Sequence, residues 1–426
     1  MTQEFRKIQP LSHEVSSLKL AEPDHFLLDN GIPVYTVDAG TEDLIKLDLI
    51  FDAGHFYQSQ ALVASFTNKC LQEGTTSFSS QAIANTIDFY GAHLRHATDK
   101  DDARVALYCL GKHFDNLLPL LAEVVFQPTF PEEEVNTIIE KSKQHYHVNM
   151  EKVKFVAQQK FGGLIFGQTH PYASLLNEGD YEKVAHHQMA EFHAKHYLDS
   201  PFKIIVSGKL PKDINKKINS FFGKHAIAKN NVGITIPEAL ASEKREHLIL
   251  KENSLQSALR IGKVLFNKHH PDFIKMKVVN TILGGYFGSR LMTNIREDKG
   301  YTYGIGSMVT SLKHEGVFTI ASEVGADVRE KALVEVFKEI EKLRSDLVLD
   351  EELKLVKNYM LGSFLRSADG PFALSELVKS VVDYGFGMDY FDKVLATIKN
   401  ITAKEIRDLS VKYLDPASMT TLVVGK

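Results

Sequence analysis

The sequence has little cysteine and no long apolar run. Its two cysteines, Cys70 and Cys109, are too few for a disulfide framework and form no C-x-x-C pair, which suits a reducing compartment. No apolar stretch approaches the roughly 18 residues that a membrane-spanning helix needs. The opening residues, MTQEFRKIQPLSHEVSSLKL, also lack the apolar core and the small-residue cleavage site of a secretory signal. The expected location is therefore the cytoplasm.

An excess of charge of one sign is also missing. The chain has 50 Lys and Arg residues against 54 Asp and Glu residues, and the net charge is −4. The basic residues are dispersed among acids, as in EKREH and REDKG. This balance gives no electrostatic reason to expect nucleic acid or an anionic membrane as a partner.

The sequence motifs of common catalytic sites are absent as well. Among the 18 histidines, no pair has the i, i+4 helical spacing joined to a carboxylate that zinc sites use. The glycine-rich LGGYFGSR at 283–290 lacks the G-K-[ST] of a phosphate-binding loop, and its glycines are expected to allow close packing at a helix end. No G-x-S-x-G elbow is present. Motif spacing therefore offers no catalytic nucleophile.

What the sequence does contain is an internal repeat. KHYLDSPFKIIVSGK at 195–209 and KYLDPASMTTLVVGK at 412–426 share Tyr-Leu-Asp, a proline, an apolar strand-like run and Gly-Lys. FPEEEVNTIIEKSKQ from Phe130 likewise matches LDEELKLVKNYMLGS from Leu349, and in both an acidic first turn opens an amphipathic helix. Two matches at nearly the same separation indicate a duplicated chain.

The repeat predicts two halves of similar fold. We place an N-terminal domain at 20–224, a linker at 225–245, where the sequence loses its periodicity, and a C-terminal domain at 246–426. Strand patterns such as KLDLIFDAG and RVALYCLG alternate with helical patterns such as HFDNLLPLLAEVVF. We therefore expect an α+β fold, twice, in which a mostly antiparallel sheet has one face covered by helices.

The residues from 271 to 307, PDFIKMKVVNTILGGYFGSRLMTNIREDKGYTYGIGS, carry a resemblance to a known family. Their order is an apolar helix, L-G-G, a small residue before Arg-Leu, R-E-x-x-G-x-x-Y and an extended strand. It resembles the second domain of the pitrilysin/insulinase family of zinc metallopeptidases, which includes mitochondrial processing peptidase. FDAGHFYQ, LQEGTTSFSS, IDFYGAHL and THPYASLLNEG extend the likeness through the first half. The resemblance implies a clamshell-like chain that forms half of a peptide-enclosing dimer.

The zinc site is where this sequence departs from the family. The family motif H-x-x-E-H supplies two histidine ligands and a glutamate that acts as general base. Aligned back from the Gly-Thr turn, those positions fall at Ser65, Asn68 and Lys69. The family's third ligand falls near Ser142, with Glu140 close by. A hydroxyl is a poor zinc ligand, an amide accepts no proton from water, and an ammonium repels the ion, so we expect no metal site in this chain.

A second departure concerns the edge strand that in active members pairs with the substrate through an Asn-Ala. The equivalent here is Arg95-His96. Substrate pairing by the first half is therefore not expected to follow the family pattern.

The family's substrate-holding pair is retained. The family has an arginine and, seven residues on, a tyrosine, and Arg296 and Tyr303 have that spacing. The turn EDKG should reverse the chain with a positive φ at Gly300. The period of two in YTYGIGS should place Tyr301, Tyr303 and Ile305 on one face, with Tyr301 serving only in packing. Arginine and tyrosine side chains are hydrogen-bond donors suited to a peptide carbonyl or its developing oxyanion.

The resemblance thus implies a non-catalytic, substrate-binding subunit of a two-chain zinc metalloendopeptidase. Arg296 and Tyr303 would serve a homologous partner subunit that carries H-x-x-E-H and the zinc, and this chain would have no activity alone. One alternative is a zinc-free homodimer that binds peptide without cutting it. Another is a structural core-type scaffold without peptidase activity, against which the retained pair weighs. The sequence identifies neither the partner nor the peptide substrate.

Overall fold

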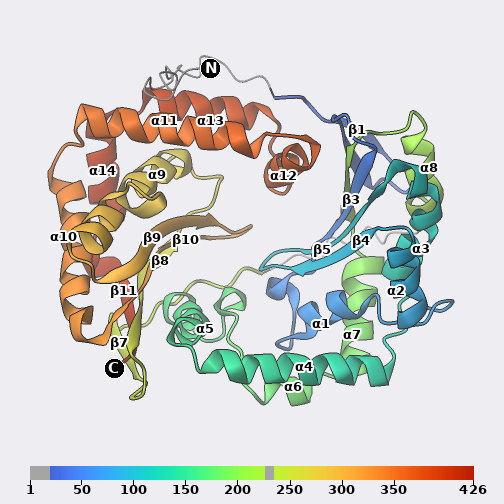
Figure 1. The fold of residues 1–426 in the computed structure, drawn as a ribbon, viewed down its shortest axis with the longest axis horizontal. Coiled ribbons are helices and arrows are strands. Elements are labelled where there is room, and N and C mark those ends of the chain that lie inside the picture. The colour runs from blue at the N-terminus through green and yellow to red at the C-terminus, as the bar shows by residue number, and fades with distance from the viewer. Residues whose placement is uncertain (1–19, 226–234) are drawn as a thin grey trace, which may run out of the picture.

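The computed structural model describes residues 20–225 and 235–426, which form two halves, each built on one β-sheet (Figure 1). The first sheet has the strand order β1-β2-β6-β3-β5-β4. Its strands are β1 (Asp24–Leu27), β2 (Pro33–Asp38), β3 (Leu44–Phe51), β4 (His93–Thr98), β5 (Ala103–Leu110) and β6 (Phe202–Gly208). The helices of this half are α1 (Val63–Cys70), α2 (Ser80–Phe89), α3 (Phe114–Phe126), α4 (Glu132–Met150), α5 (Val153–Phe166), α6 (Asp180–Lys183), α7 (His186–His193) and α8 (Ile214–Phe222).

The second half has a sheet with the strand order β7-β11-β8-β10-β9. Its strands are β7 (Glu246–Leu250), β8 (Gln256–Leu265), β9 (Thr302–Ser311), β10 (Gly316–Gly325) and β11 (Thr420–Gly425). The helices are α9 (Phe273–Asn280), α10 (Arg329–Ser345), α11 (Asp350–Ser367), α12 (Pro371–Val382), α13 (Asp389–Asn400) and α14 (Ala403–Tyr413).

The two sheets have one topology, as the internal repeat predicts. β6 is parallel to β2 and antiparallel to β3, and β11 is in the same way parallel to β7 and antiparallel to β8. The remaining pairs are antiparallel in both sheets, and β1 is an addition to the first. The repeated sequences at 195–209 and 412–426 contain β6 and β11. The prediction of two homologous, mostly antiparallel α+β units is confirmed.

The repeated helices also form where the sequence places them. α4 and α11 both begin with three acidic residues in the first turn, where the helix dipole favours negative charge: Glu132, Glu133 and Glu134, and Asp350, Glu351 and Glu352. Neither N-cap residue accepts a hydrogen bond through its side chain. The acidic residues are thus the local signal that begins both helices.

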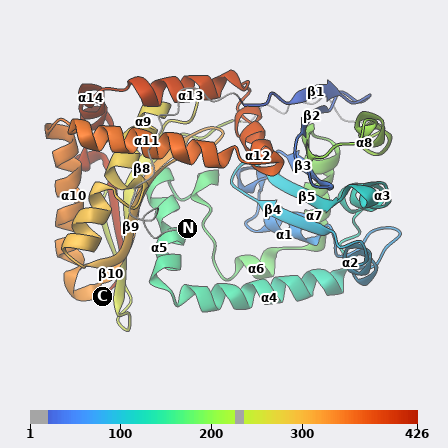
Figure 2. The same ribbon diagram turned by 45° about the horizontal axis from the view of Figure 1, so that its top comes forward.

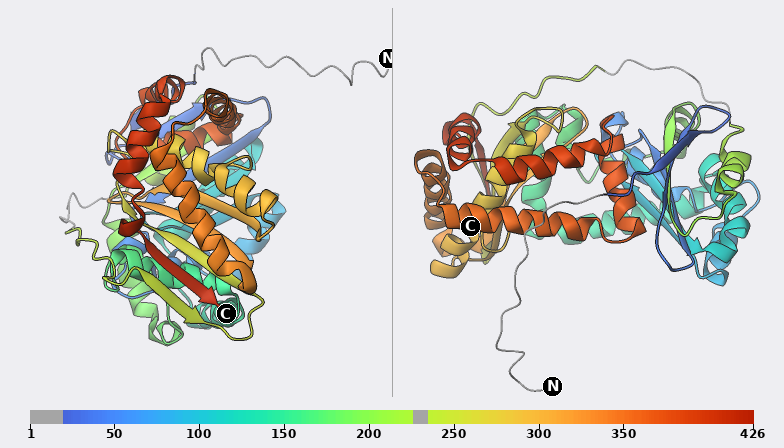
Figure 3. Two further views of the ribbon diagram at one scale, coloured as in Figure 1. Left: turned by 90° about the vertical axis from the view of Figure 1, so that its left-hand side faces the viewer. Right: turned by 90° about the horizontal axis from the view of Figure 1, so that it is seen from above.

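Alternate residues of the central strand β3 face two different environments. Leu47, Leu49 and Phe51 belong to the main core of the first half, which also contains residues of α1, α3, α7 and α8. Ile50, on the opposite face, clusters with Val378 of α12 from the second half. α12 lies beside the first sheet in two views (Figures 1 and 2). From above, orange-red helices of the second half reach toward the blue strands of the first (Figure 3).

The second sheet is covered in the reciprocal way. Val156 and Phe161 of α5, a helix of the first half, share a core cluster with Leu422 and Val424 of β11. Each half therefore lends one helix to the face of the other half's sheet that is turned toward the lending half (Figure 1). The expectation that helices cover one face of each sheet is wrong for this reason: the second face is buried by a helix from the other half.

Charged residues lie within this interface. Lys46 and Asp48 of β3 are each 1% exposed, and their charged groups approach to 3.1 Å. Glu376 of α12 accepts hydrogen bonds from Lys46 and Arg104, and Arg104 also pairs with Asp48 at 2.7 Å. Burial alone would raise the pKa of Glu376, but the bonds from Arg104 and Lys46 outweigh it and lower the pKa to about 2.

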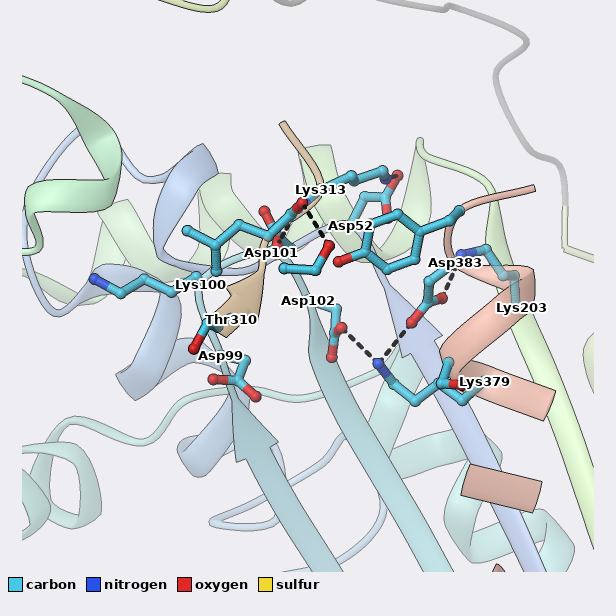
Figure 4. A pocket seen from close by; sticks show the side chains of 14 residues that line it. Asp52, Asp99, Lys100, Asp101, Asp102, Lys203, Thr310, Lys313, Lys379 and Asp383 are labelled. Carbon is cyan, nitrogen blue, oxygen red and sulfur yellow. Dashed lines mark hydrogen bonds and ion pairs between the residues drawn. The ribbon is translucent and has the colours of Figure 1, made fainter. Parts of the chain in front are cut away.

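A second group of charges surrounds a cavity of about 240 Å³ between the halves (Figure 4). Lys379 of α12 bonds to both Asp102 and Asp383 at 2.7 Å. Lys313, in the turn between β9 and β10, reaches Asp52 at the end of the first sheet, also at 2.7 Å. Ion pairs thus join the halves at several points around this cavity.

Two sequence-based expectations fall partly or wholly outside the described residues. The opening stretch, expected not to be a secretory signal, lies mostly in residues 1–19, and residues 226–234 make up part of the linker placed at 225–245. The described part, 235–245, has no helix or strand and runs along α5, where Leu240 N–H donates to the Phe166 carbonyl at 2.9 Å. Within the described chain, none of the helices combines the length and apolarity needed to cross a membrane.

Replacing Glu376 by glutamine should destabilise the junction between the halves. The substitution leaves Lys46 and Arg104 to share one carboxylate, Asp48. Since Glu376 is itself half-exposed, we expect a loss of about 1–3 kcal/mol rather than the full cost of breaking a buried pair. Urea denaturation followed by circular dichroism measures the loss. Glu182→Gln, which removes an exposed partner of Lys143, is the control and should leave the midpoint unchanged.

The difference in stability between the native chain and Glu376→Gln should depend on pH. The folded-state pKa of Glu376 is about 2, below its ordinary value of 4.5. Its contribution to stability is therefore present above about pH 4.5 and is lost as the pH falls toward 2. The gap in denaturation midpoint between the native chain and Glu376→Gln should narrow over that range. A gap that is constant with pH would contradict the assignment.

Candidate functional site

The arginine and tyrosine predicted to bind substrate lie on two sides of a tight turn in the second half. Arg296 lies in the last turn of a π-helical segment, Met292–Asp298. Tyr301 N–H donates to the Ile295 carbonyl at 3.0 Å, which brings the chain straight back into β9. Gly300 has a φ of +66°, the positive value predicted from the sequence. Segments of this helix type occur often at functional sites.

A β-bulge directs the tyrosine outward. Ser322 of β10 is paired with Ile305 and Val324 with Thr302, so Tyr303 and Gly304 together oppose the single residue between them on β10. A bulge of this kind changes the direction in which side chains point. Tyr303 is 92% exposed, whereas Ile305 is buried. The expectation that these two residues share a face is therefore wrong, and the bulge is the reason.

Two side chains satisfy the backbone groups that the bulge frees. The Thr302 hydroxyl donates to the Glu323 carbonyl at 2.6 Å and accepts from Gly304 N–H at 3.1 Å. The Ser322 hydroxyl donates to the Gly304 carbonyl at 3.0 Å. The bulge is thus a fixed feature of the sheet edge. Tyr301, which precedes it, packs against the core, as the sequence predicts.

Arg296 lies near two exposed aromatic rings. Its guanidinium carbon is 4.5 Å from the centre of the Phe287 ring and 6.0 Å from the centre of the Tyr303 ring, both within the range of cation–π attraction. Phe287 is 63% exposed. The structure therefore brings the predicted pair together and adds a third residue, Phe287, that sequence reasoning missed.

The hydrogen-bonding groups of this cluster are available. Throughout the described residues, the Arg296 side chain has no ion pair or hydrogen bond, and the Tyr303 hydroxyl has no hydrogen bond. A guanidinium carries five N–H donors in a planar fork that matches carbonyl and carboxylate oxygens. The cluster of Arg296, Tyr303 and Phe287 thus presents hydrogen-bond donors that have no partner, and the turn, the bulge and the aromatic rings hold these donors in place.

Glycine brings the segment before the site close to β9. A Cβ added to Gly284, in the π-helical segment Thr281–Gly285, would lie 2.7 Å from the Ser307 backbone nitrogen. Close packing at a helix end was predicted for LGGYFGSR, and it occurs here against a strand. The spacing of residues in that stretch does not predict that Phe287 belongs to the site. The one feature of the sequence that could have indicated it is a large aromatic residue among glycines.

The positions of the family's zinc motif lie on α1 and have other uses. The Ser65 hydroxyl is 2.8 Å from Nε2 of His55. The Asn68 amide donates to the Ala97 carbonyl of β4 at 2.8 Å, so it ties the helix to the sheet edge. Lys69 is exposed. A hydroxyl, a bonded amide and an exposed ammonium do not fit a zinc ion.

The remaining positions of the family's site supply no further donor set. Glu140 is exposed and lines a hollow formed by α4 alone, while Ser142 is half-buried. No group of three metal-ligating side chains occurs among residues 20–225 and 235–426. On β4, Arg95 is exposed, and both ring nitrogens of His96 are buried without a partner. Burial lowers the pKa of His96 to about 4, so its ring is neutral near pH 7.

Known proteins resemble this chain in sequence along most of its length. The "Uncharacterized zinc protease YmxG" of Bacillus subtilis (strain 168) is 23% identical over 81% of this chain and 84% of that protein. The "Non-peptidase homolog YmxG" of Helicobacter pylori is 21% identical over 86% and 85%. The "Mitochondrial-processing peptidase subunit beta" of Bos taurus is 22% identical over 93% and 83%. Relatives are thus named both zinc proteases and non-peptidase homologues.

A solved structure and two family models agree with these relatives. The peptidase M16 inactive domain from Pseudomonas fluorescens superposes with a TM-score of 0.86 at 25% identity, covering 95% of this chain and 98% of that one. The model described as "Insulinase (Peptidase family M16)" matches residues 34–161, and "Peptidase M16 inactive domain" matches residues 183–360. The chain belongs to the insulinase family of peptidases, family M16, as a member that lacks the H-x-x-E-H motif.

Proposed function

We propose that this chain is the non-catalytic, substrate-binding subunit of a two-chain zinc metalloendopeptidase. The observation that carries the proposal is the free Arg296 guanidinium beside the exposed Tyr303 ring. An arginine kept only for stability would be expected to use its donors on the protein's own carboxylates or carbonyls. Arg290 shows the contrast in the same half, since it forms a two-bonded ion pair with Glu352.

The chemistry of the pair suits a peptide in the course of cleavage. Attack on a peptide bond places negative charge on the carbonyl oxygen, and donors aimed at that oxygen stabilise the transition state. Arg296 supplies a charged hydrogen-bond donor and Tyr303 a neutral one, and both are attached to a rigid part of the backbone. At the position where the family has its water-activating glutamate this chain has Asn68, whose amide accepts no proton from water.

The partner in this proposal is a homologous chain with H-x-x-E-H intact. A bovine relative is named as a subunit of mitochondrial-processing peptidase, which supports assembly from more than one chain. Zinc would be held by that partner, and the peptide would be bound between the two chains. A peptide-binding homodimer without zinc is the principal alternative, and a scaffold without peptidase activity leaves the free Arg296 unexplained.

Arg296→Ala and Tyr303→Phe should disable cleavage without dissociating the complex. Loss of one oxyanion donor lowers turnover by about 10²–10³ in other enzymes, and we expect a loss of that order here. The measurement is cleavage of unstructured fluorescent peptides by the two-chain complex, with size-exclusion chromatography of each variant. Both side chains are at the surface, so folding should be unaffected.

Matched variants make this experiment specific. Lys299→Ala removes a neighbouring exposed cation from the same turn, and Tyr301→Phe removes a hydroxyl from the packed tyrosine two residues away. Both should retain full activity. Full activity of a complex that carries Arg296→Ala or Tyr303→Phe would sink the assignment of these residues.

Phe287→Ala should weaken peptide binding while leaving the donors in place. The ring lies 4.5 Å from the guanidinium carbon and restricts where Arg296 can point. Loss of a cation–π contact costs about 0.5–2 kcal/mol, or roughly two- to thirtyfold in affinity. Fluorescence anisotropy with a labelled unstructured peptide measures the change. Phe89→Ala, which removes an 82%-exposed ring on α2, is the control, and an equal effect of both substitutions would show that Phe287 has no particular role.

A further inference from the structure

A polar cavity of about 380 Å³ lies next to the first position of the lost zinc motif. Its walls are the start of α1, the middle of α5, the loop at 173–176 and the side chain of Lys100. α5 and the loop are in close contact, since a Cβ added to Gly162 would lie 2.4 Å from the Ala173 carbonyl oxygen. One wall is thus held by close packing of α5 against the loop that follows it.

The lining carries one cation and no anion. Lys100 is its only lysine or arginine, and none of the described residues that line the cavity is an aspartate or glutamate. The Lys100 ammonium donates to the Tyr172 carbonyl at 2.8 Å and to the Ser174 hydroxyl at 2.6 Å, which leaves a third N–H. Its side chain extends away from Asp99 and Asp101 (Figure 4). Lys100 also borders the cavity between the two halves, where aspartates offset the lysines, but those aspartates do not line the present cavity.

Further polar groups line the same cavity. His55 and Ser65 are hydrogen-bonded to each other at 2.8 Å. Burial, with help from Lys100, lowers the pKa of His55 to about 4, so the pair is neutral near pH 7. The side-chain oxygen of Gln159 is buried and has no hydrogen-bond partner. An acceptor without a partner calls for a hydrogen-bond donor at that point, which a water molecule bound beside an anionic ligand supplies.

Backbone strain is concentrated at the rim. Leu62 has a φ of 77° and Ser174 a φ of 48°, and both line the cavity. Non-glycine residues rarely adopt such angles, and their strain is often found at ligand sites. In the described residues only one other non-glycine residue, Phe130, has a positive φ. Two of the three strained positions therefore belong to this one cavity.

We propose that this cavity is a binding site for the carboxylate group of a small, mostly aliphatic ligand. One ammonium balances one negative charge, which fits a carboxylate better than a phosphate dianion. Leu62, Leu175 and Leu176 offer apolar surface for an attached hydrocarbon chain. The carboxylate belongs either to a free short-chain acid or to the carboxyl end of a peptide. The site is separate from Arg296 and does not depend on the proposed peptidase partner.

The test is a binding measurement on the full chain with matched probes. Isothermal titration calorimetry would compare 3-methylbutanoate, its uncharged amide 3-methylbutanamide and inorganic phosphate. We expect the acid to bind at least about tenfold more tightly than the amide, because the amide oxygen accepts the hydrogen bond from Lys100 without a negative charge. A short peptide ending in leucine, with a free or an amidated carboxyl end, then distinguishes a peptide terminus from a free acid.

Variants tie the binding to the cavity. Lys100→Gln should abolish binding of the acid, and Ser65→Ala should weaken it severalfold. Lys69→Gln removes a lysine from the exposed side of the same helix and should have no effect. If Lys100→Gln fails to fold, the pKa of Lys100 followed by NMR in the unmodified chain replaces it.

That pKa provides an independent readout. Burial lowers the pKa of Lys100 to about 8, against the opposing influence of Asp101 and Asp99. A bound carboxylate must raise this pKa, and binding must weaken as the pH rises above about 8. The proposal would be overturned if the acid and the amide bound equally, or if phosphate bound as tightly as the acid or more tightly. It would also be overturned if the pKa of Lys100 did not change, or if the acid did not bind at about 10 mM, which is weaker than the roughly millimolar limit of specific binding.

Discussion

The fold depends on the exchange of helices between its two halves. α12 covers the face of the first sheet that is turned toward the second half, and α5 covers the corresponding face of the second sheet, so neither half could bury both faces of its sheet alone. Apolar contacts such as Ile50 with Val378 lie beside the charged group of Lys46, Asp48 and Glu376. Buried ion pairs are costly unless every partner is present, so they favour one register of the two halves. The duplicated chain behaves as one structural unit for this reason.

That frame gives the candidate site its rigidity. β9 is held by β10 and by the helical segments that precede it, and the bulge at Tyr303 is fixed by the hydroxyls of Thr302 and Ser322. Arg296 lies in the last turn of a π-helical segment and has aromatic rings nearby. The proposed contact of these two donors with a peptide would gain from such preorganisation. In the first half, the positions of the family's zinc motif are used differently: Ser65 and Asn68 of α1 form hydrogen bonds within the chain.

Much of this could be predicted from the sequence, and the reasons are local. Repeated motifs, acidic first turns and the glycine at position 300 are signals carried by a few neighbouring residues, and the structure confirms each of them. The seven-residue spacing of Arg296 and Tyr303 also identified two residues that are close in space.

What could not be predicted depends on partners distant in sequence. The bulge is defined by the register of β10 against β9, so the outward turn of Tyr303 cannot be read from YTYGIGS. The position of the Phe287 ring beside Arg296 depends on how the chain between them folds. The helix exchange left one trace, the charged Lys46 and Asp48 on alternate positions of an otherwise apolar strand, but their partner Glu376 lies in the other half.

The proposal of a two-chain peptidase is tested most directly by the intact mass of the complex that this chain forms in its own cells, measured by native mass spectrometry after gentle isolation. We expect a complex near twice the mass of one chain, whose second chain carries H-x-x-E-H and zinc and which cleaves unstructured peptides. A homodimer of this chain without zinc and without cleavage would contradict it.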